Sequence, residues 1–142
     1  MNDLRAILPQ PTSTTEAFWA ACDEGRLMMT RCAACGHLFH FPRPFCIQCG
    51  SDDVALNPMS GLGSIFSLTS VAMSFYGSTW QDQVPYTVIL VDLDEGPRIA
   101  SRLVGPDHGD ASIGDRVRAI FPEIDGRRLP FFERVTQSEP GA

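Results

Sequence analysis

Five short segments in the second half of the chain have the pattern of β-strands. They are rich in β-branched and aromatic residues and are bounded by turn residues, which is typical of small all-β folds. Residues 94–97 (DEGP) predict a tight hairpin turn between two of them. No helical periodicity interrupts the five segments, so they predict a small closed or half-closed barrel of the OB-fold type. The predicted strands cover residues 63–73, 86–93, 98–104, 115–121 and 129–135.

An amphipathic helix is predicted before these strands. Ser13 followed by Glu16 is a capping box, and Gly25 stands where a helix C-terminus is expected. The segment RLMMTR that follows the glycine predicts a short strand. Residues that recur at i, i+3 and i+4 give the helix one apolar face and are expected in the core. These residues are Phe18, Ala21 and Cys22.

Two Cys-x-x-Cys pairs lie between the helix and the barrel segments. They are Cys32/Cys35 and Cys46/Cys49, with ten residues between them. Two such pairs are a strong signal for a metal site, because each pair can form a tight turn that points both sulfurs at one ion. A glycine follows each pair and permits the backbone conformation that this turn needs. Four thiolates favour tetrahedral zinc, and a closed four-sulfur shell predicts a structural role for it.

The sequence alone leaves other uses of the four cysteines open. Iron in a rubredoxin-like site has the same tetrahedral sulfur geometry. A redox pair is disfavoured because thioredoxin-like chemistry uses one Cys-x-x-Cys, and a disulfide is disfavoured in a reducing compartment. His37 and His40 are alternative ligands. Because four cysteines already complete a shell, we interpret both histidines as loop and packing residues.

The composition indicates a globular protein with an acidic balance. Its 142 residues are 44% hydrophobic and 20% charged, and the formal net charge is −6. No apolar run approaches the roughly 20 residues of a membrane helix, and the N-terminus lacks a signal-peptide pattern, so a cytoplasmic location is predicted. Binding to a phosphate backbone usually needs a dense basic surface. We therefore expect neither a nucleic acid nor a membrane as a partner.

The order of helix, cysteine ribbon and barrel is accompanied by a set of short motifs. They are FWAACDEGRL, RCAACG, FPRPFCIQCGS, SGLGSIFSLTSV, PYTVILVDLDEGPRI, IGDRV and LPFFERV. With these motifs, residues 15–135 resemble the family catalogued as domain of unknown function thirty-five. The resemblance implies a mainly β fold with an N-terminal helix, a rubredoxin-like zinc ribbon and a five-stranded, acyl-CoA-associated OB-fold barrel. Ile47 departs from the family pattern, which often has proline there.

The resemblance also implies an accessory subunit instead of a self-sufficient enzyme. Family members look like components of thiolase-superfamily enzymes, including ketothiolases, acyltransferases and retro-aldolases that act on acyl-CoA thioesters such as steroid side-chain intermediates. The partner then carries the reacting residues, and a hetero-oligomer is expected. The sequence contains no Gly-x-Ser-x-Gly elbow, His-Glu-x-x-His helix or Walker loop, which agrees with the expectation of no catalytic residue here.

Aromatic residues and one arginine are the candidates for contact with CoA or with the partner. Arginine suits phosphates, and aromatic rings suit adenine and pantetheine. Adjacent phenylalanines in the last predicted strand must point to opposite faces, one into the barrel and one outside. Ordinary core packing is the alternative for each ring. The candidates are Phe41, Arg43, Phe45, Phe75, Tyr76, Trp80, Phe131 and Phe132.

These observations divide the chain into three predicted parts. They are a helical lead-in over residues 1–30, a zinc ribbon over 31–58 and an OB-fold over 59–142. The favoured hypothesis is a non-catalytic, acyl-CoA-associated subunit that binds a thiolase-superfamily partner. Two other hypotheses stay open: a nucleic-acid-binding ribbon and OB module, which the net charge of −6 opposes, and a rubredoxin-like electron carrier with iron.

Overall fold

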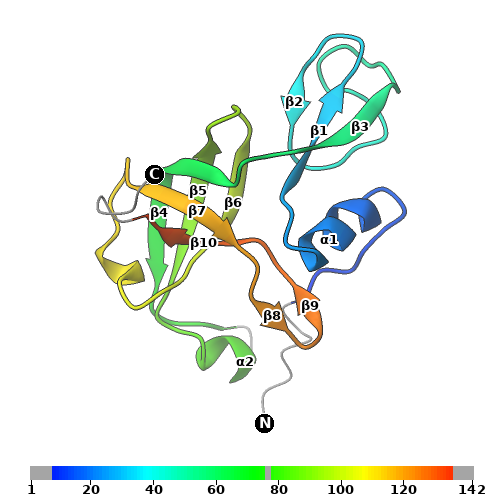
Figure 1. The fold of residues 1–142 in the computed structure, drawn as a ribbon. Helices are drawn as coiled ribbons and strands as arrows, with labels where there is room; N and C mark the ends of the chain where they lie inside the picture. Colours follow the sequence, from blue (N-terminus) through cyan, green and yellow to red (C-terminus); the bar gives the residue numbers. More distant parts are fainter. Residues whose placement is uncertain (1–7, 76–77, 136–142) are drawn as a thin grey trace.

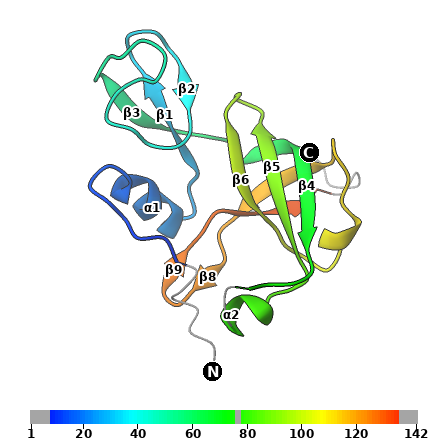
Figure 2. The same cartoon turned by 180° about the vertical axis from the view of Figure 1, so that it is seen from behind.

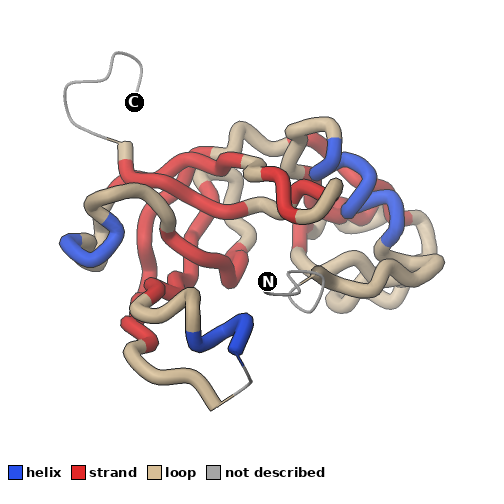
Figure 3. Tube along the Cα trace, turned by 90° about the horizontal axis from the view of Figure 1, so that it is seen from below, coloured by secondary structure: helices blue, strands red, loops and turns tan. Residues whose placement is uncertain are grey.

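The computed structural model describes residues 8–75 and 78–135 of the chain. Two lobes lie side by side: a helix with a small three-stranded sheet, and a β-barrel (Figure 1). Seen from behind, helix α1 (Glu16–Asp23) lies between the three-stranded sheet and a short hairpin (Figure 2). Viewed from below, the barrel consists mainly of strands, and the helices lie at the margins of the molecule (Figure 3). The predicted fold class is thereby confirmed.

Five strands form the closed barrel. Strand β4 pairs with β5, then β6, β10 and β7 follow, and β7 closes the ring on β4. All neighbours are antiparallel except β10 and β6, which run parallel. This order is that of a five-stranded OB-fold, and each predicted strand is confirmed to within two residues at its ends. The strands are β4 (Leu62–Val71), β5 (Tyr86–Leu93), β6 (Arg98–Leu103), β7 (Arg116–Ile120) and β10 (Phe131–Arg134).

Alternation along the strands fills the barrel. In β5 every second residue, from Thr87 to Leu93, is buried, because successive side chains point to opposite faces. The same rule separates the two phenylalanines of β10: Phe132 is 0% exposed inside the barrel, while Phe131 is half-buried on the outer face. The predicted opposite orientation of this pair is confirmed.

Gly63 marks a close approach between β4 and β5. A Cβ atom at this position would lie 2.5 Å from the carbonyl oxygen of Asp92 and 2.7 Å from Cγ1 of Val91. No side chain fits there, so the strands pair this closely only because the residue is glycine.

Helix α1 begins later than its sequence predicts, because Thr12 and Thr15 form the turn that precedes it. The Thr12 N–H donates to Thr15 Oγ1 (2.9 Å), and the Thr15 N–H donates to Thr12 Oγ1 (3.2 Å). The predicted Ser13 capping box is therefore wrong: threonine one residue earlier supplies an equally good acceptor, and Thr15 takes the N-cap position. The predicted stop at Gly25 is confirmed, with φ of +76°.

A three-stranded antiparallel sheet follows the helix. Its order is β2 (Leu38–Phe39), β1 (Met28–Cys32), β3 (Val54–Pro58). Of these strands the sequence predicted β1 alone. The predicted division between residues 30 and 31 falls inside β1, which belongs to the ribbon sheet and also packs toward the barrel.

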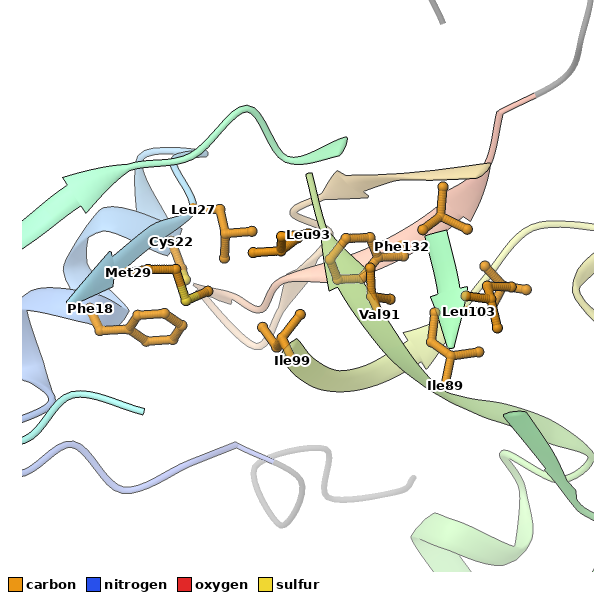
Figure 4. Packing of buried hydrophobic residues seen from close by; sticks show 12 residues of the cluster. Phe18, Cys22, Leu27, Met29, Ile89, Val91, Leu93, Ile99, Leu103 and Phe132 are labelled. Carbon is orange, nitrogen blue, oxygen red and sulfur yellow. The ribbon is translucent and has the colours of Figure 1, made fainter. Parts of the chain in front are cut away.

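One continuous core joins the two lobes. Phe18 and Cys22 of α1 belong to the same cluster of buried side chains as Met29 of β1 and Ile99 of β6 (Figure 4). Burial raises the pKa of the Cys22 thiol to about 12, so this cysteine stays neutral as a core residue, as predicted. Each fully buried side chain of this kind contributes about 1.5–3 kcal/mol relative to its exposed state.

A short hairpin, β8 (Glu123–Ile124) and β9 (Arg127–Arg128), fixes the other end of α1. Asp23 accepts hydrogen bonds from the Arg128 N–H (2.9 Å) and from Arg127 Nε (3.0 Å). This hairpin was not predicted, although its Asp-Gly dipeptide at 125–126 is a hairpin signal. Two single-turn elements, α2 (Ser78–Gln81) and a 3-10 helix (His108–Asp110), complete the described fold. Among the described residues no helix is long and apolar enough to cross a membrane.

Replacement of Phe132 tests the barrel core. We expect Phe132→Ala to lower the free energy of unfolding by about 3–5 kcal/mol, because it leaves a cavity among fully buried side chains. Phe131→Ala is the matched control on the outer face, and we expect less than half of that loss. Urea unfolding followed by circular dichroism measures both. An equal loss for the two variants would contradict the burial pattern of β10.

Candidate functional site

The two Cys-x-x-Cys pairs form two equivalent tight turns. In each turn the N–H of the following glycine donates to the carbonyl oxygen of the first cysteine, Gly36 to Cys32 at 2.8 Å and Gly50 to Cys46 at 3.0 Å. Both glycines have φ between +77° and +79°, a conformation that favours glycine over other residues. The predicted role of the glycine after each pair is confirmed.

These turns bring the four predicted metal ligands together. The Sγ atoms of Cys32 and Cys49 are 3.6 Å apart, as are those of Cys35 and Cys46, and all four lie within 4.8 Å of one another. A disulfide would require about 2.05 Å, and the cysteines are free thiols. Four sulfurs around zinc would be about 3.8 Å apart, given Zn–S bonds of about 2.3 Å. The donor set therefore fits a four-coordinate structural metal ion.

Local hydrogen bonds favour a thiolate at one of these positions. Burial opposes ionisation of Cys46, but N–H groups of Cys49 and Gln48 outweigh it and lower the pKa of the thiol to about 7. The Gln48 N–H lies 3.3 Å from the Cys46 sulfur. Metal ligands must be thiolates, and in this group the pKa of Cys46 is lowered while burial and the neighbouring thiols raise the pKa values of Cys35 and Cys49.

The ribbon has very little core apart from the cysteines. Its buried cluster contains Cys32, Phe39 and Cys46, with Val54 packed at the side. His37 stacks on Phe39 at a centroid distance of 5.6 Å and is outside the four-sulfur group. A metal crosslink would thus replace the apolar packing that a sheet of this size cannot provide.

A second candidate site is an apolar pocket of about 590 Å³ between the two lobes. Residues of helix α1 and of the segment after β2 line one side, and residues on the outer face of β5 and β6 line the other. Figure 2 shows α1 on the side of the barrel where β6 and β5 lie. The volume lies in the range of pockets that bind small molecules. OB-folds commonly bind ligands on the face of their second and third strands, which are β5 and β6 here. The helix and the ribbon loop turn this face into a pocket.

Aromatic rings form much of the pocket lining. Phe18 of α1 packs edge-on against Trp19 (4.9 Å between centroids) and Phe41 (5.5 Å). On the barrel side, the ring centroids of Trp80 and Tyr86 are 5.6 Å apart. Both tryptophans of the chain therefore line the same pocket.

Three of the predicted contact residues meet in this pocket, namely Phe41, Trp80 and Phe131. They come from the ribbon loop, the segment before β5, and β10, which are far apart in the sequence. Two further residues, Tyr86 and Arg102, also line the pocket but were not among the predicted contact residues. The available signal was alternation: both residues occupy outward positions of predicted strands.

The other predicted contact residues lie elsewhere. Arg43 and Phe45 are exposed on the ribbon, and Phe75 is 86% exposed after β4. Phe132 packs inside the barrel and is closed to a ligand or partner in this fold. Tyr76 lies outside the described residues.

His40 is also placed at the pocket, where it packs against Phe18 at 5.2 Å. Burial lowers the pKa of its imidazole to about 4, so it is neutral at pH 7. It takes no part in the four-sulfur group, which confirms its interpretation as a packing residue.

Comparison with known proteins identifies both lobes. The rubredoxin-like zinc ribbon domain of ChsH2 matches residues 19–55, and the C-terminal OB-fold domain of ChsH2 matches residues 57–121. A solved structure described as "Ltp2-ChsH2(DUF35) aldolase" superposes with a TM-score of 0.80 and 31% identity. The match covers 91% of this chain and 100% of that chain.

Two relatives extend the comparison. A "Probable enoyl-CoA hydratase alpha subunit" of Thermomonospora curvata is 34% identical over 138 residues, which is 95% of this chain and 42% of that protein. The chain thus spans less than half the length of this relative. A "DUF35 domain-containing scaffold protein" of Methanothermobacter thermautotrophicus is 30% identical over 96 residues, 67% of this chain and 71% of the scaffold protein. The chain therefore belongs to the DUF35 family, with a rubredoxin-like zinc ribbon and an OB-fold of the ChsH2 type.

Proposed function

We propose that the chain is a non-catalytic accessory subunit of an acyl-CoA-converting enzyme and binds a thiolase-superfamily partner. The observation that carries this proposal is the match to the whole length of the DUF35 chain in a solved aldolase. The name of the Thermomonospora relative, a hydratase alpha subunit, also supports a place in a hetero-oligomer of acyl-CoA metabolism. In this assignment the partner supplies the reacting groups for thiolase, acyltransferase or retro-aldol chemistry.

The exposed apolar side chains of the ribbon are the proposed partner surface. Phe45 is 49% and Ile47 53% exposed, on either side of the ligand Cys46, and Arg43 lies close by in the sequence. Large exposed apolar residues that lie together favour a protein interface. Phe75, after β4, is a further candidate contact.

The pocket is the proposed contact with acyl-CoA. Phe41, Trp80 and Phe131 give it an apolar, aromatic wall suited to the acyl part of a thioester. A pocket between two lobes also encloses such a chain better than an open barrel face would. We propose zinc for the four-sulfur site, where Cys32, Cys35, Cys46 and Cys49 would hold the ion and its contribution would be structural.

Metal analysis tests the ribbon. We expect the purified chain to be colourless, to contain a single zinc ion, and to lose its ribbon structure when a strong chelator removes it. Cys46→Ser should lose the metal, whereas Cys22→Ala should keep it, because Cys22 lies in the core between helix and barrel. Elemental analysis and backbone NMR spectra measure these outcomes. A red iron-loaded protein, or a folded ribbon without metal, would contradict the zinc assignment.

Affinity purification from the native organism tests the partner. We expect a thiolase-superfamily subunit to co-purify, and the reconstituted pair to form a stable complex in analytical ultracentrifugation. The double variant Phe45→Ser, Phe75→Ser should weaken this complex by about tenfold or more, since removal of aromatic anchors often costs over 1 kcal/mol each. Ile113→Ser, which changes an exposed apolar residue outside the predicted contacts, is the control. Turnover of an acyl-CoA thioester by the isolated chain would refute the accessory role.

A further inference from the structure

Arg102 is an unusual residue in the pocket because it is a half-buried cation with no carboxylate partner in the described part of the chain. Among the described residues that line the pocket, it alone carries a charge. No carboxylate of the described residues lies within ion-pair distance of it. By contrast Arg98, on the same strand, pairs with Asp92 at 2.6 Å, and Arg116 pairs with Asp94 at 2.7 Å. In a chain of net charge −6, this lack of a partner is not explained by a shortage of carboxylates.

The guanidinium of Arg102 is held in place but not fully hydrogen-bonded. Nη1 donates to Gln83 Oε1 at 3.1 Å, and the carbon of the guanidinium lies 5.2 Å from the Tyr86 ring centroid and 6.0 Å from that of Phe131. Nε is buried and has no acceptor among the residues that the structure describes. Burial of a charged donor without an acceptor is costly, so an anion bound beside Arg102 would be stabilised.

The surroundings of Arg102 select the kind of anion. The planar guanidinium matches a carboxylate in a two-point interaction, and among the described residues only its Nη1 has an acceptor. Around it the pocket is formed mainly by aromatic and aliphatic side chains, which favour an apolar body. His40 Nδ1, also buried and without a partner, is neutral and adds no charge.

We propose that the pocket binds an acyl group that carries a free carboxylate, and that Arg102 is the residue that binds this carboxylate. The inference rests on the proposed function in assigning acyl groups to the pocket, and it adds a specificity-determining residue and a substrate class. The carboxylate has two sources: a free carboxylic acid, or the distal carboxylate of a dicarboxylic acyl thioester. In both cases the apolar chain lies against Phe41, Trp80 and Phe131.

Four matched probes test the proposal on the full-length, metal-loaded chain without a partner. They are decanoate, decanamide, decanoyl-CoA and sebacoyl-CoA, which differ in the presence and position of a free carboxylate. Isothermal titration calorimetry measures affinity. Tryptophan fluorescence locates the binding, because both tryptophans line the pocket. We expect decanamide and decanoyl-CoA to bind about 10- to 100-fold more weakly than the better carboxylate probe, as loss of a charge-assisted pair predicts.

Three variants identify the residue. Arg102→Gln should weaken binding of the carboxylate probe by about 10- to 100-fold and leave decanamide binding unchanged. Arg102→Lys keeps the charge but loses the planar fork, so we expect an intermediate affinity. Arg98→Gln is the matched control on the same strand, since Arg98 stacks over Phe66 away from the pocket, and should bind like the parent chain. The parent chain with four probes already provides a test if a variant fails to fold.

The outcomes separate the two sources and the alternatives. Tighter binding of decanoate assigns a free acid, and tighter binding of sebacoyl-CoA assigns a dicarboxylic thioester. Equal binding of decanoate and decanamide together with equal binding of sebacoyl-CoA and decanoyl-CoA, or no binding of any probe, overturns the proposal. Binding of decanoyl-CoA that matches sebacoyl-CoA and weakens in Arg102→Gln also overturns it, because Arg102 would then hold a phosphate. If the complex with the partner still forms but the probes show no preference for a carboxylate, this inference fails and the proposed function stands.

Discussion

The packing of α1 and β1 against the barrel is the contact on which the rest of the structure depends. Phe18, Cys22 and Met29 are buried with Ile99 in one continuous cluster, so the ribbon is fixed to the barrel by the same apolar burial that stabilises the barrel itself. Asp23 adds a directed contact at the end of the helix through Arg127 and the backbone of Arg128. Since these groups fix the position of one lobe against the other, they also fix the width of the pocket between them.

The ribbon depends on a different interaction, because its apolar cluster is too small to hold three short strands. Two of its buried side chains are the cysteines Cys32 and Cys46 themselves. Sulfurs 3.6 Å apart, on turns stabilised by glycine N–H donors, are preorganised for an ion that binds all four at once. A metal at this point stabilises the ribbon and, through Phe41 and His40 on the loop after β2, one wall of the pocket.

The molecule thus combines a structural metal site with an enclosed version of the OB-fold ligand face. Arg102 is the one charged group that the described lining presents there, and its neighbours orient it without neutralising it. Other arginines of the barrel do have carboxylate partners, as Arg98 has in Asp92 and Arg116 in Asp94. The two proposed tasks, to bind a partner subunit and to select an acyl group in the pocket, are compatible in one small chain.

Local patterns in the sequence determined the strands of the barrel, the end of α1 at Gly25, and the four-cysteine site. Each depends on residues close in sequence: period-two alternation, a left-handed glycine, and cysteines separated by two residues within each turn. The start of α1 and the β8–β9 hairpin were not predicted, because competing caps and a two-residue strand leave weak signals. Only the tertiary structure decided that Phe41, Trp80 and Phe131 face one pocket with Arg102, and that Phe132 does not. These residues come from four separate segments, and their proximity depends on how the helix packs on the barrel, which no local pattern encodes.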